Sequence, residues 1–312
     1  MKSDSKFILA LQVNEVWDWM LEIYDLPRSL MNAEYKETLR SIESTLGDMT
    51  LHTWKTGQAV GDWTVPKDWK VNKAFIADGA GHKIVDISQN SLHLAGYSTS
   101  VSAVMSFQEL SHHLCHSEKI EDAIPYLTHY YQEAWSFCVT ASQLKKLAEH
   151  EKLQVEIDSF TEAGELVVGE LSFNGTLKSQ INFNTYLCHP ALANNELSGP
   201  AISILVGKYL THLQSTKGLR HTYSIFWEPE TIGAIALLSK KKDYFQDNLL
   251  AGYVLTCLGD EHNYGFISAR RDSTLSERML VRSLKEKKVD FIKYPFSQRG
   301  SDERQFCWPT VD

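Results

Sequence analysis

Three β-prone segments alternate with two helical segments in the second half of the chain, and this order constrains the fold more than any other feature. The β-prone segments cover residues 180–187, 222–227 and 252–258. Apolar residues recur at helical spacing over residues 198–213, and a shorter helical pattern covers residues 232–238. Such an alternation predicts right-handed crossovers, and therefore an α/β domain with a mostly parallel central sheet and helices on both faces.

The first half of the chain has a different character. Helical periodicity over residues 16–46 breaks once, at Pro27. From about residue 50, short β-prone runs are separated by glycines and prolines. At 312 residues the chain is long enough for one large domain or two ordinary ones. We therefore expect a small β-rich module set between helical segments.

Composition argues against several classes of function. A formal charge of −8 disfavours nucleic acid as a partner, because phosphate binding requires a basic surface. The apolar stretch near the N-terminus is short and is interrupted by Asn14 and Glu15, so we expect neither a signal peptide nor a membrane span. The five cysteines are scattered and form no CxxC pair, which predicts reduced thiols in a cytoplasmic protein.

Polar side chains follow each of the three predicted strands. His189 follows the first, Glu228 and Glu230 follow the second, and Asp260 follows the third. Because the carboxyl ends of parallel strands meet at one edge of a sheet, we expect these side chains to lie close together. Imidazole and carboxylate groups are zinc ligands, so the pattern indicates a metal centre. Such a centre activates water for attack on a carbonyl group, while a carboxylate takes the proton.

Each of these residues also has an ordinary structural explanation. A single histidine after a strand is most often a loop residue, and glutamates near a helix start interact favourably with the helix dipole. Their joint occurrence at three successive strand ends favours a metal site. The sequence pattern alone leaves both interpretations open.

Several long motifs resemble those of a known family. The run TYLCHP at 185–190, followed by ANNELSGP at 193–200, is similar to bacterial proteins with an aminopeptidase-like domain. These proteins form a divergent branch of the zinc aminopeptidase superfamily and are often associated with polysaccharide biosynthesis. The resemblance covers nearly the whole chain, because further motifs of this family lie at residues 25–30, 62–69, 123–126, 229–233, 256–260 and 299–306.

The resemblance implies a fold of the zinc aminopeptidase or phosphorylase/hydrolase type. Residues 1–54 and 136–312 would form the catalytic domain, and residues 55–135 would form the inserted β-rich domain. Members of the family continue beyond the point that matches Val311 and Asp312, and a last histidine ligand lies in that continuation. The catalytic domain is therefore expected to be incomplete at its C-terminus, with weak or lost activity as one expectation.

The resemblance also assigns roles to single residues. One or two zinc ions would be held by His189, Asn195, Glu196, Glu230 and Asp260. Glu230 or Glu228 would be the general base, with Glu230 preferred. Two departures weaken this ligand set, because Ala191 and Asn195 stand where the wider superfamily has aspartate.

Substrate contacts are expected from residues further along the chain. Arg270, Arg271 and Arg299 follow strand-like segments and would suit a substrate carboxylate, or would form ion pairs within loops. By resemblance, a substrate-side loop contains Ser301, Asp302 and Glu303. The aromatic cluster around Tyr130, Tyr131 and Trp135 either lines a pocket or packs against the inserted module.

The leading hypothesis is a cytoplasmic, zinc-dependent hydrolase of the aminopeptidase type that cleaves an amide bond of a peptide or aminoacyl substrate. One alternative keeps the site but changes the substrate to an N-acyl sugar in polysaccharide biosynthesis. Another is a non-catalytic binding or scaffold protein with the aminopeptidase fold. The expected partner is a small-molecule or peptide-like substrate, with no nucleic acid and no membrane. The oligomeric state is left open, a homo-oligomer included.

Overall fold

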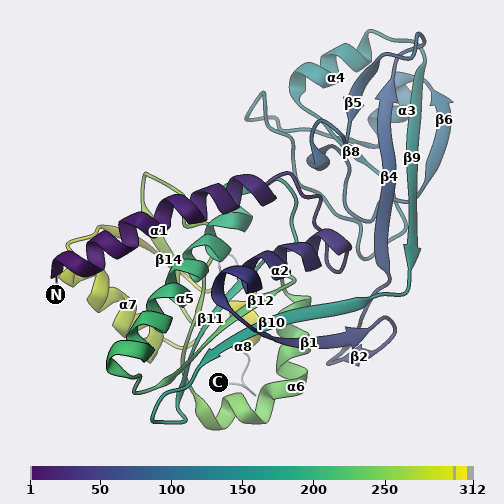
Figure 1. Cartoon of the computed structure of the whole chain (residues 1–312). Coiled ribbons are helices and arrows are strands. Elements are labelled where there is room, and N and C mark those ends of the chain that lie inside the picture. Colours follow the sequence, from purple (N-terminus) through teal and green to yellow (C-terminus); the bar gives the residue numbers. More distant parts are fainter. Residues whose placement is uncertain (1, 298–299, 308–312) are drawn as a thin grey trace.

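The computed structural model describes residues 2–297 and 300–307, and Figure 1 shows that they form a larger and a smaller part. A five-stranded sheet lies at the centre of the larger part, and a four-stranded sheet at the centre of the smaller part. Two separate sets of buried apolar residues fill the two parts. The chain therefore has two hydrophobic cores.

The five-stranded sheet is mixed rather than mostly parallel. Its strands, in spatial order, are β1 (Thr50–Lys55), β10 (Glu165–Phe173), β12 (Thr222–Glu228), β11 (Gln180–Tyr186) and β13 (Leu249–Val254). β10 pairs antiparallel with β1 and β12, whereas β11 pairs in parallel with β12 and β13. The prediction of a mostly parallel sheet was wrong for β1 and β10. β10 enters directly from β9 (Leu153–Glu162), without the crossover helix on which that prediction depended.

Helices lie on both faces of this sheet, as the alternation of elements predicts. α5 (Ser198–Lys217) connects β11 to β12, and α6 (Ile232–Asn248) connects β12 to β13. Successive residues of β12 point to opposite faces. Trp227 donates a 2.8 Å hydrogen bond to Ser203 of α5, whereas Phe226 packs edge-on against Phe245 of α6, with 5.9 Å between ring centroids.

The N-terminal helices α1 (Lys2–Ile23) and α2 (Ala33–Leu46) pack on the α5 side of the sheet (Figure 1). The break that Pro27 predicts is present between them. The side chain of Asn32 caps α2 by accepting the backbone N–H of Tyr35 at 3.2 Å. The buried hydroxyl of Tyr35 donates a 2.7 Å hydrogen bond to the carbonyl of Val167 in β10. The periodic face of α2 is thereby fixed against the sheet.

The four-stranded sheet of the smaller part is entirely antiparallel. Its strands are β5 (Lys83–Asp86), β4 (Asp68–Ala77), β9 and β6 (Val101–Met105). The short helices α3 (Phe107–Ser111) and α4 (Ala141–Ala148) and the pair β7 (Leu114–Cys115) and β8 (Phe137–Cys138) lie in the same part (Figure 1). β9 belongs to this sheet and β10 to the larger one, so the chain passes between the parts at residues 163–164. The exact domain boundaries stay a prediction.

The remaining elements complete the larger part. They are the hairpin β2 (Ala59–Val60) and β3 (Trp63–Thr64), the parallel pair β14 (Tyr264–Ile267) and β15 (Phe291–Tyr294), and the helices α7 (Leu275–Glu286) and α8 (Glu303–Phe306). A 3-10 turn covers Ser91–His93 in the smaller part, and one π-helical turn covers Ala193–Leu197 before α5 in the larger part. Among the residues described, no helix is both long and apolar enough to cross a bilayer.

A buried ionic cluster joins β1, β10 and α6. Glu170 in β10 is 8% exposed and lies 2.6 Å from Nε2 of His52. Lys241 of α6 donates to both carboxylate oxygens of Glu170 at 2.7 Å. Burial alone would raise the pKa of Glu170, but the hydrogen bonds from His52 and Lys241 outweigh it and lower the pKa to about 2.

Replacing Glu170 by glutamine should therefore lower the free energy of unfolding at pH 7 by roughly 2 kcal/mol. Because the folded-state pKa of Glu170 lies below its unfolded value, this contribution is complete above about pH 5. It is lost as the pH falls toward 2. Urea unfolding at pH 7, 5 and 3.5 should show the difference between wild type and Glu170→Gln shrinking with acidification.

The exposed Glu37 of α2 provides the control. Glu37→Gln should change the free energy of unfolding by less than about 0.5 kcal/mol at each pH. A Glu170→Gln difference that is the same at pH 7 and pH 3.5 would contradict the assignment.

Candidate active site

The carboxyl ends of β11, β12 and β13 meet at one edge of the larger sheet, and each is followed by a residue with a positive φ angle. The φ angles are 45° at Ala191, 65° at Thr231 and 52° at Cys257. Residues other than glycine populate this region sparsely, and they keep it only where the surrounding structure fixes them. Such residues gather at functional sites. The strained edge coincides with the strand ends to which the sequence analysis assigned the candidate residues.

His189, after β11, is held between two glutamates. Its Nδ1 atom lies 2.6 Å from Oε2 of Glu196, and its backbone N–H donates to Oε1 of the same carboxylate at 2.9 Å. Its Nε2 atom lies 3.2 Å from Oε2 of Glu230. Burial would lower the pKa of His189, but Glu196 and Glu230 outweigh it and raise the pKa to about 9. At neutral pH the ring is therefore a cation between two carboxylates.

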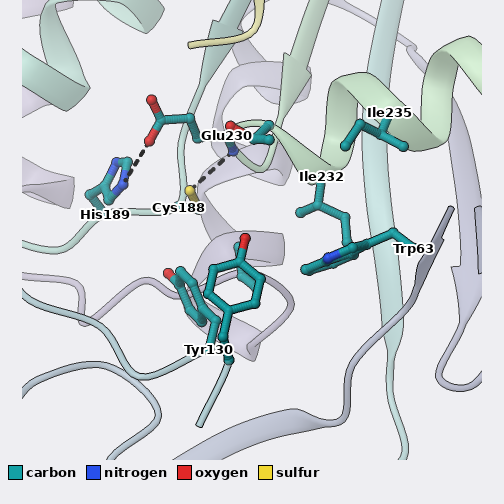
Figure 2. A pocket seen from close by; sticks show the side chains of 10 residues that line it. Trp63, Tyr130, Cys188, His189, Glu230, Ile232 and Ile235 are labelled. Atoms are coloured by element: carbon teal, nitrogen blue, oxygen red, sulfur yellow. Dashed lines mark hydrogen bonds and ion pairs between the residues drawn. The ribbon is translucent and has the colours of Figure 1, made fainter. Parts of the chain in front are cut away.

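Glu230, after β12, is anchored from three directions. Its backbone N–H donates to Sγ of Cys188 at 3.2 Å, and its Oε2 atom faces His189 (Figure 2). Its Oε1 atom accepts a 2.6 Å hydrogen bond from the hydroxyl of Ser301. The side chain of Glu230 is 31% exposed. It is thus fixed in position and yet accessible from solvent.

Two fully buried carboxyl groups lie behind Glu230. Glu228 accepts a 3.0 Å hydrogen bond from Asn184, and Asp302 accepts the backbone N–H of Thr231 at 2.6 Å. The second oxygen of each has no hydrogen-bond partner among the described residues. Burial raises the pKa of both groups, and the charge of Glu228 raises the pKa of Asp302 further. Glu228 has no exposed surface, so Glu230 is the one of the two glutamates that is accessible from solvent.

Asn195 and Asp260 make other contacts. The side-chain amide of Asn195 points at Sγ of Cys257, 3.9 Å away. Asp260 is exposed, and its carboxylate accepts the backbone N–H of His262 at 2.6 Å. β13 ends at Val254, earlier than the sequence predicts, so Asp260 lies well beyond the strand end. Within residues 2–297 and 300–307, no three His, Cys, Asp or Glu side chains are arranged to hold a metal ion.

Zinc fits this arrangement only in part. Two nitrogen or oxygen ligands on a tetrahedral zinc lie roughly 3.3 Å apart, given bond lengths of about 2.0 Å. Nε2 of His189 and Oε2 of Glu230 are 3.2 Å apart. Glu196 binds the opposite nitrogen of the ring, so it orients the imidazole and does not reach the same ion. Zinc sites use at least three protein ligands, and the described residues do not complete that set.

The predicted substrate-binding residues separate into two places. Ser301 and Asp302 lie against Glu230 and Thr231, and the carboxylate of Glu303 accepts the backbone N–H of Ser301 at 3.0 Å. Arg270 lines a second hollow of about 340 Å³ beyond β14 and β15, and Arg271 is exposed nearby in sequence. Arg299 lies outside the described residues. The substrate-binding roles of these residues stay predictions.

A cavity of about 130 Å³ opens beside His189 and Glu230. Figure 2 shows aromatic and aliphatic side chains on its other sides, and its apolar lining consists of Leu30, Trp63, Tyr130, Tyr131, Ile232 and Ile235. Tyr130 and Tyr131 belong to the aromatic cluster that the sequence singled out, and here they line a pocket. Trp63 was not recognised as a pocket residue. It meets Tyr131 edge-on at 6.2 Å between ring centroids, a contact that sequence spacing does not reveal.

Sequence reasoning also missed a buried arginine. Arg28 is 2% exposed, and its Nη1 atom donates to the carbonyl of Ile23 at 2.5 Å. Burial lowers the pKa of Arg28, while the nearby charge of Glu196 opposes that shift. Arg28 therefore places a positive charge near the otherwise costly buried carboxylate of Glu196. The motif at residues 25–30, which contains Arg28, was the sequence signal that could have identified this residue.

Comparison with known proteins places this geometry in context. The chain matches the family described as "Domain of unknown function (DUF4910)" over residues 17–312. It is 32% identical over 298 residues to a Clostridium acetobutylicum protein named for polysaccharide biosynthesis and an aminopeptidase-like domain. The alignment covers 96% of this chain and 67% of that protein.

Solved structures show the same fold. A Clostridium acetobutylicum crystal structure named for a peptidase has a TM-score of 0.92 at 32% identity, over 100% of this chain and 72% of that chain. The zinc aminopeptidase BSAP from Bacillus subtilis has a TM-score of 0.58 at 11% identity, over 91% of this chain and 80% of that chain. A peptidase M28 precursor from Shewanella amazonensis has a TM-score of 0.61 at 10% identity, over 98% of this chain and 86% of that chain. The last two similarities concern the fold alone.

The ligand geometry predicts that dialysed protein retains at most one zinc per chain, because no three His, Cys, Asp or Glu side chains of the described residues converge and His189 and Glu230 are the pair at the strand ends with zinc-ligand spacing. His189→Ala and Glu230→Ala should each remove whatever zinc is retained. Asp260→Ala, the matched control, should leave the zinc content unchanged. Inductively coupled plasma mass spectrometry gives the stoichiometry. Two zinc ions per chain, or a loss of zinc on Asp260→Ala, would show that the site uses ligands that this geometry does not predict.

Proposed function

The chain belongs to the DUF4910 family, and on that premise we propose that it is an aminopeptidase-like hydrolase that cleaves an amide bond next to an apolar group. The observation that carries the proposal is the pair formed by His189 and Glu230 at the mouth of a largely apolar cavity. The aminopeptidase fold of the structural relatives supports the reaction class. Zinc enters no step, because the described residues do not complete a ligand set for it.

In the proposed reaction, Glu230 takes a proton from a water molecule that attacks the carbonyl carbon of the amide. Oε2 of Glu230 accepts the proton in exchange for its contact with Nε2 of His189, while Oε1 keeps its hydrogen bond from Ser301. As Oε2 becomes protonated, the Nε2–H of His189 is released from it and donates instead to the oxyanion that develops on the carbonyl oxygen. Glu230 then returns the proton to the leaving nitrogen. Water and amide thus give a carboxylic acid and an amine.

The size and lining of the cavity favour a substrate with an apolar group beside the scissile bond. Its volume of about 130 Å³ is close to that of the roughly 150 Å³ apolar cavities that bind benzene. Trp63, Ile232 and Ile235 line one side. A branched aliphatic or aromatic side chain therefore fits the space better than a small or charged one.

A second substrate class is favoured by one observation. The Clostridium acetobutylicum relative is named for polysaccharide biosynthesis, and an N-acyl sugar contains the same kind of amide bond. If the protein hydrolyses no amide, the alternative of a non-catalytic binding protein is favoured.

Aminoacyl p-nitroanilides of glycine, alanine, leucine and phenylalanine test the main proposal. We expect kcat/KM for the leucine and phenylalanine substrates to exceed that for glycine by roughly ten- to hundredfold, as burial of the side chain predicts. Glu230→Gln should lower kcat by about a hundredfold or more, whereas Glu261→Gln, an exposed control, should not. Faster acetate release from N-acetylglucosamine than from any anilide would instead support the sugar alternative.

Tyr131 allows a test of the cavity, because its side chain is 80% exposed and its removal uncovers little buried surface. Tyr131→Ala should reduce the preference for leucine over glycine by several-fold, through loss of apolar contact at the cavity mouth. Tyr264→Ala removes a tyrosine that is 61% exposed in β14 and should leave the preference unchanged. Equal effects of the two substitutions would exclude the cavity as the determinant of specificity.

A further inference from the structure

We infer that Ser301 and Asp302 are positioning residues for Glu230; this inference rests on the proposed function of Glu230. The sequence analysis assigned both residues to substrate binding. In the structure, their side chains are bonded to the turn that follows β12. Asp302 has no exposed surface, so it cannot touch a substrate in this arrangement.

Ser301 acts on the carboxylate directly. Its hydroxyl donates to Oε1 of Glu230 at 2.6 Å, a length typical of a charge-assisted hydrogen bond to a carboxylate. The Glu230 side chain is 31% exposed, and this hydrogen bond fixes the rotation of its carboxylate. With Oε1 occupied, Oε2 is directed at Nε2 of His189, 3.2 Å away. The hydroxyl thus fixes the orientation in which Oε2 of Glu230 faces His189.

Asp302 acts on the backbone. Thr231 has a φ of 65°, a conformation that a β-branched residue adopts only under constraint. Oδ1 of Asp302 accepts the N–H of Thr231 at 2.6 Å and holds this conformation in place. The preceding N–H, of Glu230, is bonded to Cys188. These two bonds fix the backbone from which the Glu230 side chain projects.

The segment that contains Ser301 is itself anchored. The backbone N–H of Ser301 donates to both carboxylate oxygens of Glu303, each at 3.0 Å. α8 begins directly after Asp302, and its Phe306 packs against Phe245 of α6 at 5.9 Å between ring centroids. The packing of α8 against α6 therefore supports the two residues, and positioning of a base requires such support.

Kinetics of the leucine anilide separate positioning from substrate binding. Ser301→Ala should lower kcat by roughly ten- to hundredfold with KM changed less than about twofold, since a misplaced base affects the chemical step. Ser301→Thr restores a hydroxyl and should return kcat to within about threefold of wild type. Asp302→Asn keeps the acceptor oxygen and should be milder than Asp302→Ala. A rise in KM with unchanged kcat in Ser301→Ala would overturn the inference in favour of substrate contact.

A second measurement does not need activity. In protein labelled with ¹⁵N-histidine, the ring signals of His189 should shift in Ser301→Ala, because Oε2 of Glu230 moves away from Nε2. They should stay unchanged in Ser301→Thr and in Ser215→Ala, an exposed control on α5. If wild type hydrolyses no amide while these signals shift as expected, the proposed function fails and the positioning by Ser301 stands. Unshifted His189 signals in Ser301→Ala would overturn the inference even in an active enzyme.

Discussion

The parallel pairing of β11 with both β12 and β13 is the constraint on which the site depends. Tyr186 lies opposite Glu228 in the register, so His189 and Glu230 emerge from adjacent strands at the same height. Side chains alternate between the faces of a strand, and a slip of one residue would exchange the buried position of Glu228 with a neighbour. The hydrophobic faces toward α5 and α6 prevent that slip. Core packing and site geometry are therefore set by the same pairing.

The buried charges at this edge serve geometry more than stability. A buried ion pair rarely stabilises a fold by itself, because desolvation offsets the attraction between the charges. Both oxygens of Glu196 are used, one by the ring and one by the backbone of His189. This arrangement fixes the orientation of the imidazole. The nearby positive charge of Arg28 offsets part of the cost of burying the Glu196 carboxylate. His189 consequently presents Nε2, and not Nδ1, to Glu230.

Local patterns predicted the parts of the site that depend on local structure. Periodicity located β11, β12, α5 and α6, and the residues after two strands proved to be neighbours, His189 and Glu230. The pairings of β1 and β10 were missed because antiparallel partners distant in sequence leave no periodic signal of their own. Contacts such as Trp63 with Tyr131, or Ser301 with Glu230, join segments about 70 residues apart, and nothing in the spacing of the sequence predicts them.

The aminopeptidase fold supplies the edge of the sheet, and individual residues determine its chemistry. Similarity to the zinc aminopeptidases at 10–11% identity transfers the arrangement of strands but not the identity of the ligands. In this chain the positions expected to complete a metal centre hold Asn195, which contacts Cys257, and Asp260, which caps its own turn. The groups that do converge are an imidazole, one accessible carboxylate and a serine hydroxyl. These groups form a chain of hydrogen bonds from Glu196 through His189 and Glu230 to Ser301. Hydrogen bonds between side chains therefore organise this site, and the fold alone would not have revealed them.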